Sequence, residues 1–240
     1  MPLIIAHRGA SAYAPENTMA AFELARRQAA DMIELDVRLT ADGRLVVFHD
    51  ETTERWNGQT RPVATCTLAE LQALDIGGER APALEEVLDF ARVSGMRLNI
   101  ELKTTGMAAR CAELLSAFNL VEQVIVSSFS EAALRELRAV APATPRGYLM
   151  GVRTIDPAVR ARELWPFFAL RAVEAVAWHP HYDLPQLDRL IPLVRRAGYQ
   201  VNVWTVDEPE RMRALAALGA TGIITNRPDL ARQVLSHLDG

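Results

Sequence analysis

Short apolar runs alternate with amphipathic segments along almost the whole chain, and this alternation limits the possible folds more than any other feature. Between most of the runs, apolar residues recur at the spacing i, i+3, i+4 and i+7 that is typical of a helix. A repeated strand-then-helix order predicts a parallel sheet with helices outside it. The expected strands are Leu3–Ala6, Met32–Val37, Leu45–Phe48, Leu98–Leu102, Val124–Ser127, Gly147–Met150, Ala175–Trp178, Val201–Thr205 and Gly222–Thr225.

The length of 240 residues suits one closed barrel of this kind, which takes about 250 residues. We therefore predict the α/β class and a (β/α)8 TIM barrel, with residues 1–240 as a single domain. One strand candidate is in excess of the eight barrel positions, and Gly147–Met150 is the weakest of them. The expected helices are Thr18–Ala29, Leu84–Val93, Glu131–Val140, Leu187–Ala197 and Pro209–Leu218.

The chain around the third expected strand departs from the regular alternation. Only Arg38–Arg44 separates this strand from the second, which is too short for a crossover helix, so we expect a helix-free crossover with a turn at Asp42-Gly43. Residues 50–83 show little periodicity, apart from a short capped helix expected within 67–74. We predict that residues 50–83 form a small insertion after the third strand, at the mouth of the barrel where active sites lie.

Charged residues interrupt two of the apolar strands at alternate positions. Glu34 and Asp36 alternate with the apolar residues of Met32–Val37, and Asn99, Glu101 and Lys103 alternate with those of Leu98–Leu102. Successive side chains of a strand point to opposite faces, and the apolar face must meet the helices. The carboxylates therefore point into the barrel.

Three carboxylates close together inside a barrel repel one another strongly unless a cation neutralises them. Oxygen ligands favour Mg²⁺ or Ca²⁺, so we predict one divalent cation held by Glu34, Asp36 and Glu101. The alternative is a metal-free network of ion pairs. Its cations would be Arg8, Arg38 and Lys103.

Further polar residues stand at the ends of other strands, and parallel strands bring these ends to one rim. His7 and His49 suit a general acid and base near neutral pH. Arg8 and Lys103 suit an anionic group such as phosphate. Together with a metal, these groups fit phosphoryl transfer better than carbonyl chemistry. For His179 and His181, which also follow a strand, we expect a structural role.

The charge and hydropathy patterns exclude some partners. The net charge is −4 with acids and bases mixed, and there is no basic stripe for nucleic acid. No apolar segment approaches the roughly 20 residues of a membrane span, and no signal peptide is recognised. We expect a cytoplasmic protein without stable membrane association. Pro166–Leu170 is the one mild candidate for an apolar lip, and we expect it to be buried helix.

The order and spacing of several motifs resemble the glycerophosphodiester phosphodiesterases, over almost the whole chain. These motifs are His7-Arg8-Gly9, Pro15-Glu16-Asn17-Thr18, Glu34-Leu35-Asp36-Val37, Asp42-Gly43, His49-Asp50, Glu101-Leu102-Lys103, Trp204-Thr205-Val206 and Ile224-Thr225-Asn226-Arg227-Pro228. The resemblance implies a barrel and the hydrolysis of small glycerophosphodiesters to glycerol 3-phosphate and an alcohol. It implies the site roles already named, and it implies that Trp204 packs near the glycerol.

The sequence departs from the family pattern at three places. Asn226 stands where Asp is frequent, Asp207 stands where Asn is common, and Trp56 replaces a frequent Thr. We expect none of the three to contact the candidate site residues, although Trp56 would alter the outer wall of the pocket.

Two other functions remain as alternatives to the leading hypothesis. One is a lysophospholipase D or phospholipase-like enzyme that acts on lipids, and the other is a catalytically silent barrel that binds phosphodiesters. The sequence leaves open the head group, the choice between Mg²⁺ and Ca²⁺, and the oligomeric state. It also leaves open which histidine is the first acid, and whether water or the glycerol 2-hydroxyl attacks phosphorus.

Overall fold

A computed structural model describes residues 1–151 and 156–236 of the chain. Eight parallel strands close into a barrel, because β1 pairs with both β2 and β9. The predicted barrel is therefore confirmed, and Gly147–Met150, the weakest strand candidate, belongs to its wall. The barrel strands are β1 Leu3–His7, β2 Met32–Leu39, β4 Arg97–Leu102, β5 Val124–Ser128, β6 Arg146–Met150, β7 Ala177–Pro180, β8 Gln200–Val203 and β9 Gly222–Thr225.

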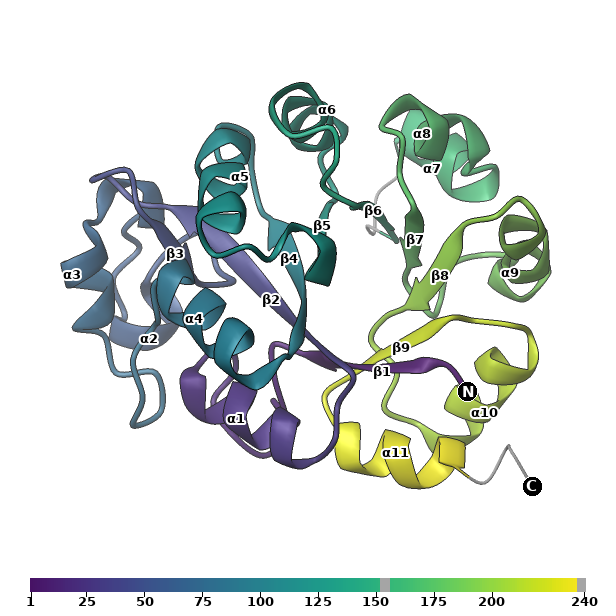
Figure 1. Cartoon of the computed structure of the whole chain (residues 1–240), viewed down its shortest axis with the longest axis horizontal. Helices are drawn as coiled ribbons and strands as arrows, with labels where there is room; N and C mark the ends of the chain where they lie inside the picture. Colours follow the sequence, from purple (N-terminus) through teal and green to yellow (C-terminus); the bar gives the residue numbers. More distant parts are fainter. Residues whose placement is uncertain (152–155, 237–240) are drawn as a thin grey trace.

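Helices surround the barrel, as Figure 1 shows. Hydroxyl side chains begin some of them, since Thr18 accepts from the backbone N–H of Ala21 and Ser130 from that of Ala133. The helices outside the barrel are α1 Met19–Arg27, α4 Leu84–Ser94, α5 Ala108–Ala117, the 3₁₀ helix η2 Val121–Gln123, α6 Glu131–Val140, α7 Pro157–Leu164, α8 Phe167–Ala172, α9 Leu187–Arg196, α10 Pro209–Ala217 and α11 Pro228–Ser236.

The strand that lies outside the barrel is β3 (Leu45–Val47), which pairs antiparallel with β2. The expectation of a crossover through Arg38–Arg44 was therefore wrong. Arg38 and Leu39 continue β2, and the chain then reverses in a tight turn in which the Thr40 N–H donates to the carbonyl of Arg44. Gly43 supplies the positive φ of 73° that this turn requires. A turn this short makes a hairpin and leaves no length for a return along the barrel.

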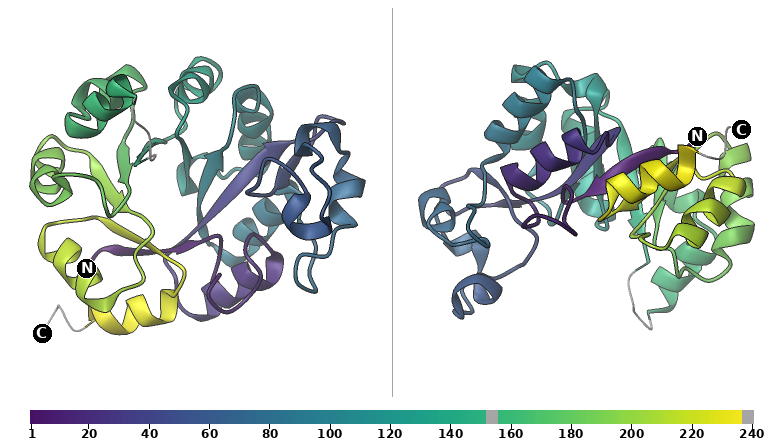
Figure 2. Two further views of the ribbon diagram at one scale, coloured as in Figure 1. Left: turned by 180° about the vertical axis from the view of Figure 1, so that it is seen from behind. Right: turned by 90° about the horizontal axis from the view of Figure 1, so that it is seen from below.

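The chain between β3 and α4 forms α2 (Glu54–Asn57), the 3₁₀ helix η1 (Val63–Thr65) and α3 (Leu68–Gln72). A capping box between Thr67 and Glu70 begins α3, which matches the short capped helix expected within 67–74. These elements enclose an apolar cluster of their own beside β3. Figure 2 shows them at the end of the molecule away from α11 and the N-terminus. Because β3 runs back toward the barrel, this segment begins beside the carboxyl ends of the strands.

The two faces of the barrel wall bury different residues. Ile33, Leu35 and Val37 pack outward with the helices, in one large apolar cluster with Leu98 and Ile100. A second cluster of the same kind joins β6 to β9 with α8 to α11. Inside the barrel lies a separate small cluster formed by Ile5, Met32, Ile125 and Ile224. The alternation of apolar and charged residues therefore sorts the side chains of β2 and β4 as predicted.

No helix in the described ranges, 1–151 and 156–236, combines the length and apolar character needed to cross a membrane. The expectation of a buried helix at Pro166–Leu170 was correct only in part. Ala169 and Leu170 of α8 are buried, but Phe168 is 74% exposed.

Candidate active site

The register of the strands builds the site in layers above an apolar floor. Ile5 pairs with Met32 and with Ile224 at the level of the floor. One step higher, His7 pairs with Glu34, and Glu34 pairs in turn with Asn99. At the next step Asp36 pairs with Glu101. Polar side chains therefore stack toward the carboxyl ends of β1, β2 and β4, where barrel active sites lie.

Three buried carboxylates lie in these two polar layers of β2 and β4. Glu34, Asp36 and Glu101 are 4%, 1% and 7% exposed, and each offers an oxygen within 4.8 Å of the others. Burial, with the charges of Asp36 and Glu101, raises the pKa of Glu34 well above its usual value. Burial also raises the pKa of Glu101 to about 7, and the charge of Asp36 adds to this effect. These carboxylates are therefore costly to ionise together.

Two cationic side chains contact the carboxylates. Lys103 Nζ lies 2.7 Å from Glu101 Oε1 and 3.2 Å from Asp36 Oδ1, and Arg8 Nε lies 3.1 Å from Asp36 Oδ2. Although burial opposes the ionisation of Asp36, the charges of Lys103 and Arg8 outweigh it, so the pKa of Asp36 is lowered. For Arg38 no ion pair with these carboxylates is recorded in the described residues, and its Nε donates to the backbone carbonyl of His49. Two of the three cations of the metal-free alternative therefore contact the carboxylates directly.

The donor set fits a divalent cation. Glu34 accepts only the backbone N–H of Arg8, at 3.0 Å, among the bonds recorded for the described residues, and no ion pair to it is recorded there. Both polar side-chain atoms of the buried Asn99, which pairs with Glu34 in the sheet, have no hydrogen-bond partner in the same part of the chain. Buried polar atoms of native proteins normally have partners. Three carboxylates with an incomplete set of counter-charges, next to an unpartnered amide, match the oxygen-rich sites of Mg²⁺ and Ca²⁺.

His7 ends β1 and lines the same cavity as Glu34 and Glu101, with Glu34 as its register partner in β2. Its Nδ1 lies 2.8 Å from the side-chain oxygen of Asn226, which follows β9. Burial and the neighbouring charge of Arg8 lower the pKa of His7 to about 4, so the imidazole is neutral at pH 7. A neutral imidazole is ready to accept a proton.

His49 reaches the same cavity from β3. Its Nδ1 lies 2.9 Å from Asp50 Oδ1, so the carboxylate orients the ring and favours a hydrogen on Nδ1. Burial lowers the pKa of His49. Although β3 runs opposite to the direction expected from the sequence, the structure does bring both histidines to one cavity. The β2–β3 hairpin places His49 beside the carboxyl ends of the barrel strands.

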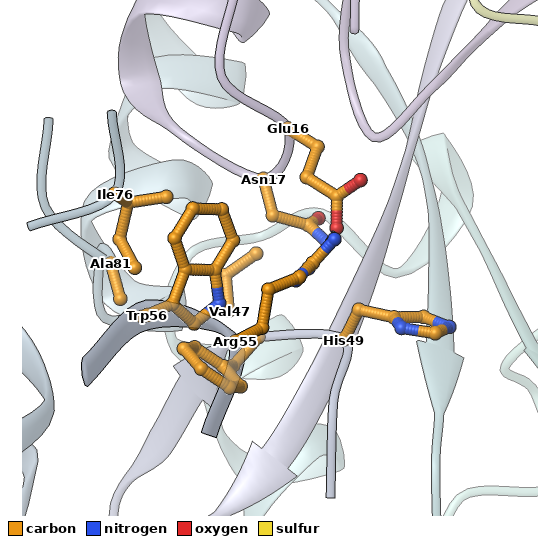
Figure 3. A pocket seen from close by; sticks show the side chains of 9 residues that line it. Glu16, Asn17, Val47, His49, Arg55, Trp56, Ile76 and Ala81 are labelled. Carbon is orange, nitrogen blue, oxygen red and sulfur yellow. The ribbon is translucent and has the colours of Figure 1, made fainter. Parts of the chain in front are cut away.

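An ion-pair chain connects His49 to Arg8 through the segment that follows β3. Arg55 of α2 lies between two acids, with Nε 2.7 Å from Asp50 Oδ2 and Nη2 2.5 Å from Glu16 Oε1. Glu16 also pairs with Arg8, at 3.0 Å. Figure 3 shows the Arg55 side chain directed at Glu16. Trp56 and His49 lie on opposite sides of Arg55, and the ring of His49 points away from Arg55. Trp56 therefore lines a neighbouring hollow of the wall.

The cavity has a volume of about 320 Å³ and two unlike sides. The charged residues come from β1 to β4 and the residues that follow these strands, Phe129, Leu149 and Trp204 come from β5 to β8 and the residues that follow them, and Ile224 belongs to the floor. The Trp204 ring meets Phe129 edge-on at 5.4 Å, and its Nε1 donates to the backbone carbonyl of His179. All eight candidate residues named from the sequence therefore border this cavity or bind one another beside it. They are His7, Arg8, Glu34, Asp36, His49, Glu101, Lys103 and Trp204.

His179 lies below the cavity and is fully buried inside the barrel. Its ring fills the space left by the missing side chain of Gly147, where an added Cβ would come within 2.8 Å of the imidazole. Its Nε2 lies 3.1 Å from Asn202 Nδ2, and burial lowers its pKa to about 3. This placement agrees with the structural role expected for His179.

Two polar contacts of the site were missed from the sequence. Asn17 donates to Asp36 Oδ2 at 2.8 Å, although its motif was named only as part of the resemblance. Asn226 contacts His7, which corrects the expectation that the three departures from the family pattern stay away from the candidate residues. The second of these contacts joins residues 219 positions apart in the sequence. The Thr-Asn-Arg-Pro motif was its only signal.

The chain is similar to known proteins over almost its whole length. The profile of the "Glycerophosphoryl diester phosphodiesterase family" matches residues 7–230. A glycerophosphodiester phosphodiesterase of Caldanaerobacter subterraneus subsp. tengcongensis is 38% identical over 240 residues, which cover 95% of each chain. The crystal structure of a glycerophosphodiester phosphodiesterase from Agrobacterium tumefaciens is 33% identical and covers 97% of this chain and 100% of its own, with a TM-score of 0.81. A phosphodiesterase of Oleispira antarctica, solved in complex with the product sn-glycerol-3-phosphate, is 29% identical and covers 100% of this chain and 98% of its own, with a TM-score of 0.81.

Proposed function

The chain belongs to the glycerophosphoryl diester phosphodiesterase family, and from this premise we propose that it hydrolyses small glycerophosphodiesters to glycerol 3-phosphate and an alcohol. The proposal gives one divalent cation to Glu34, Asp36 and Glu101, and it makes His7 and His49 the acid-base pair. The observation that carries it is one cavity bordered by this buried carboxylate group and by both histidines. The product bound to the Oleispira antarctica phosphodiesterase supports the choice of substrate class.

The carboxylate group would hold Mg²⁺ or Ca²⁺ with one oxygen from each residue. When bound, such an ion supplies positive charge where phosphoryl oxygens become more negative in the transition state. Arg8 and Lys103 act on the same oxygens from the protein side. Since Asp36 and Glu16 already fix the guanidinium of Arg8, it is oriented before the phosphate arrives.

His7 and His49 move the protons of the reaction. The Nδ1 of each ring is occupied, by Asn226 in one case and by Asp50 in the other, so Nε2 is the nitrogen that meets substrate. One histidine takes the proton of the attacking hydroxyl, and the other gives a proton to the leaving oxygen. Both orders, and attack by either water or the glycerol 2-hydroxyl, agree with this arrangement.

Trp204 and its neighbours are proposed to hold the carbon skeleton of the glycerol. Phe129 and Leu149 form with it an apolar wall of the cavity, and Ile224 lies at its floor. A diester whose phosphate faces Arg8 and Lys103 would turn its glycerol carbons toward this wall.

Location in the cytoplasm remains a prediction made from the sequence.

The direct test measures glycerol 3-phosphate release from glycerophosphocholine, with EDTA, Mg²⁺ or Ca²⁺ added to purified protein. We expect EDTA to abolish release and one of the two ions to restore it. Lysophosphatidylcholine is assayed in parallel, because Trp165 and Phe168 are 52% and 74% exposed and lipid substrates were an alternative. Folded protein that releases no product with any ion would contradict the proposal, and activity on the lipid alone would favour the alternative.

Metal affinity is expected to depend on pH through the carboxylates themselves. The pKa of Glu101 is about 7 and that of Glu34 is also raised, so the metal-free fold holds protons that a cation must displace. We expect affinity to weaken by about tenfold per pH unit below 7 for each displaced proton. Calorimetric titrations at pH 6 and pH 8, in buffers of different ionisation enthalpy, measure both the affinity and the protons released.

The same shifts set the sign of the stability change. A carboxyl whose pKa is raised by folding stabilises the fold below its unfolded pKa, and this contribution is lost as the pH rises through about 7. Glu101 and Glu34 should therefore contribute less to the stability of the metal-free protein at pH 8 than at pH 6, and the melting temperature should gain more from metal at pH 8. An equal gain at both pH values would argue against a metal at these carboxylates.

A further inference from the structure

A line of hydrogen bonds runs behind His7, away from the substrate cavity. Asn226 lies between His7 and Asp207, a residue of the loop between β8 and α10. The Asn226 side-chain oxygen lies 2.8 Å from His7 Nδ1, and its Nδ2 donates to Asp207 Oδ2 at 2.6 Å. The three side chains therefore form a chain of the order carboxylate, amide, imidazole.

Asp207 is itself held in place from the other side. Its Oδ1 accepts the hydroxyl of Thr225 at 2.8 Å and the backbone N–H of Asn226 at 2.9 Å. With one oxygen occupied by these donors, the other faces the Asn226 amide. A carboxylate oxygen can only accept hydrogen bonds.

The carboxylate decides which way the Asn226 amide points. If the amide turned over, its oxygen would lie about where Nδ2 is now, against Asp207 Oδ2, and a charge-assisted hydrogen bond would become a repulsion. The amide nitrogen must therefore face Asp207, and the amide oxygen must face His7. The Ser11 hydroxyl lies 2.8 Å from the same Asn226 oxygen and 2.7 Å from the backbone carbonyl of His7, and because it has one hydrogen and can also accept, it is compatible with either amide orientation and leaves the choice to Asp207.

An amide oxygen can only accept a hydrogen bond, so the nitrogen of His7 that faces it must carry the hydrogen. In a neutral imidazole the other nitrogen, Nε2, is then the proton acceptor. We propose that Asp207, acting through Asn226, holds His7 in the Nδ1–H tautomer and so directs the basic Nε2 to the cavity. Asp207 and Asn226 are positioning residues in this arrangement, and the inference rests on the proposed function of His7.

Asp207 and Asn226 are also unusual in sequence. These are two of the three positions at which the chain departs from the pattern described above, with amide and acid exchanged between them. Because the two side chains bond to each other, the exchange keeps one carboxylate and one amide in the same pair. It changes only which of them touches His7.

The exchange suggests a test by substitution. In Asp207→Asn the new amide keeps an oxygen for Thr225 and turns its nitrogen toward Asn226. The Asn226 amide must then turn over and present its nitrogen to His7, which forces the hydrogen to Nε2. The double variant Asp207→Asn/Asn226→Asp places a carboxylate against His7 Nδ1 and an amide behind it, which restores the Nδ1–H form.

Two-bond ¹H–¹⁵N correlation spectra of metal-free protein at pH 7.5 report the tautomer, with the His7 signals assigned from His7→Ala. We expect Nδ1–H in the unaltered protein and in the double variant, and Nε2–H in Asp207→Asn. Asn226→Ala, which removes the acceptor altogether, should show both tautomers. Glu208→Gln is the matched control, since Glu208 is the exposed neighbouring acid, and it should leave the tautomer unchanged.

Kinetics on the metal-loaded enzyme separate this inference from the proposed function. We expect Asp207→Asn to lower kcat about 10²-fold or more while KM stays within about threefold, and the double variant to recover most of the loss. Unchanged Nδ1–H in Asp207→Asn, or a double variant that folds but keeps Nε2–H, would overturn the inference. A tautomer switch without loss of kcat would support the inference and count instead against His7 as an acid-base residue.

Discussion

Replacement of His49 by alanine is expected to lower kcat about 10²–10⁴-fold, the usual contribution of a general acid or base. The ring lies on the cavity wall with Nδ1 bound to Asp50, and no carboxylate of the proposed metal site depends on it for a recorded hydrogen bond in the described residues. Metal affinity should therefore persist. The measurement is steady-state kinetics with glycerophosphocholine beside a calorimetric titration of the metal.

His181→Ala is the matched control for this variant. His181 is not among the described residues that line the cavity, and its ring meets the cavity-lining Trp204 at 4.8 Å. Its removal should change kcat by less than about tenfold and act mainly on KM, because it alters the wall that holds the substrate. Full activity of His49→Ala would remove His49 from the acid-base pair, and His7→Ala tests the other member in the same assay.

Replacement of Glu34 by glutamine is expected to abolish most activity and yet to stabilise the metal-free protein. The glutamine oxygen can still accept the Arg8 N–H, so the local structure is kept. One of three charged ligands is lost, and metal affinity should fall by about 10²-fold or more. At pH 8 the substitution also removes the cost of burying this acid, whose pKa is raised by burial and by the charges of Asp36 and Glu101. We expect a gain of about 0.5–2 kcal/mol in unfolding free energy without metal.

Denaturant unfolding at pH 8, with and without metal, measures the change in unfolding free energy caused by Glu34→Gln. The gain should disappear when Mg²⁺ or Ca²⁺ is added, because only the unaltered protein is stabilised by the ion. A metal-free ion-pair network makes the opposite prediction, since there Glu34 would contribute to stability. Loss of stability in the metal-free Glu34→Gln variant would therefore favour the network.

The placement of the candidate residues could be predicted because it depends on two regular features. Alternation along Met32–Val37 decides that Glu34 and Asp36 share the inner face, and parallel pairing brings Glu101 beside them. These rules concern single strands and their immediate neighbours. They do not depend on the details of loops.

What could not be predicted depends on turns and on distant contacts. The direction of β3 follows from a tight turn at Gly43, and the count of residues before it allowed a crossover as well. Asn226 meets His7 only because β9 closes the barrel against β1. Phe129 and Leu149 are apolar residues among many, and no pattern distinguishes those that line a cavity from those that fill the core.

The closure of the barrel by its first and last strands has a consequence for the making of the protein. A ribosome delivers His7 early, but β9 and Asn226 leave it only near the end of synthesis. Until then His7 lacks its partner and β1 lacks one of its two neighbours in the sheet. The growing polypeptide therefore contains most of the candidate site residues before the closed barrel that arranges them has formed. Any fragment cut off before β9 should be inert, however well its earlier part is folded.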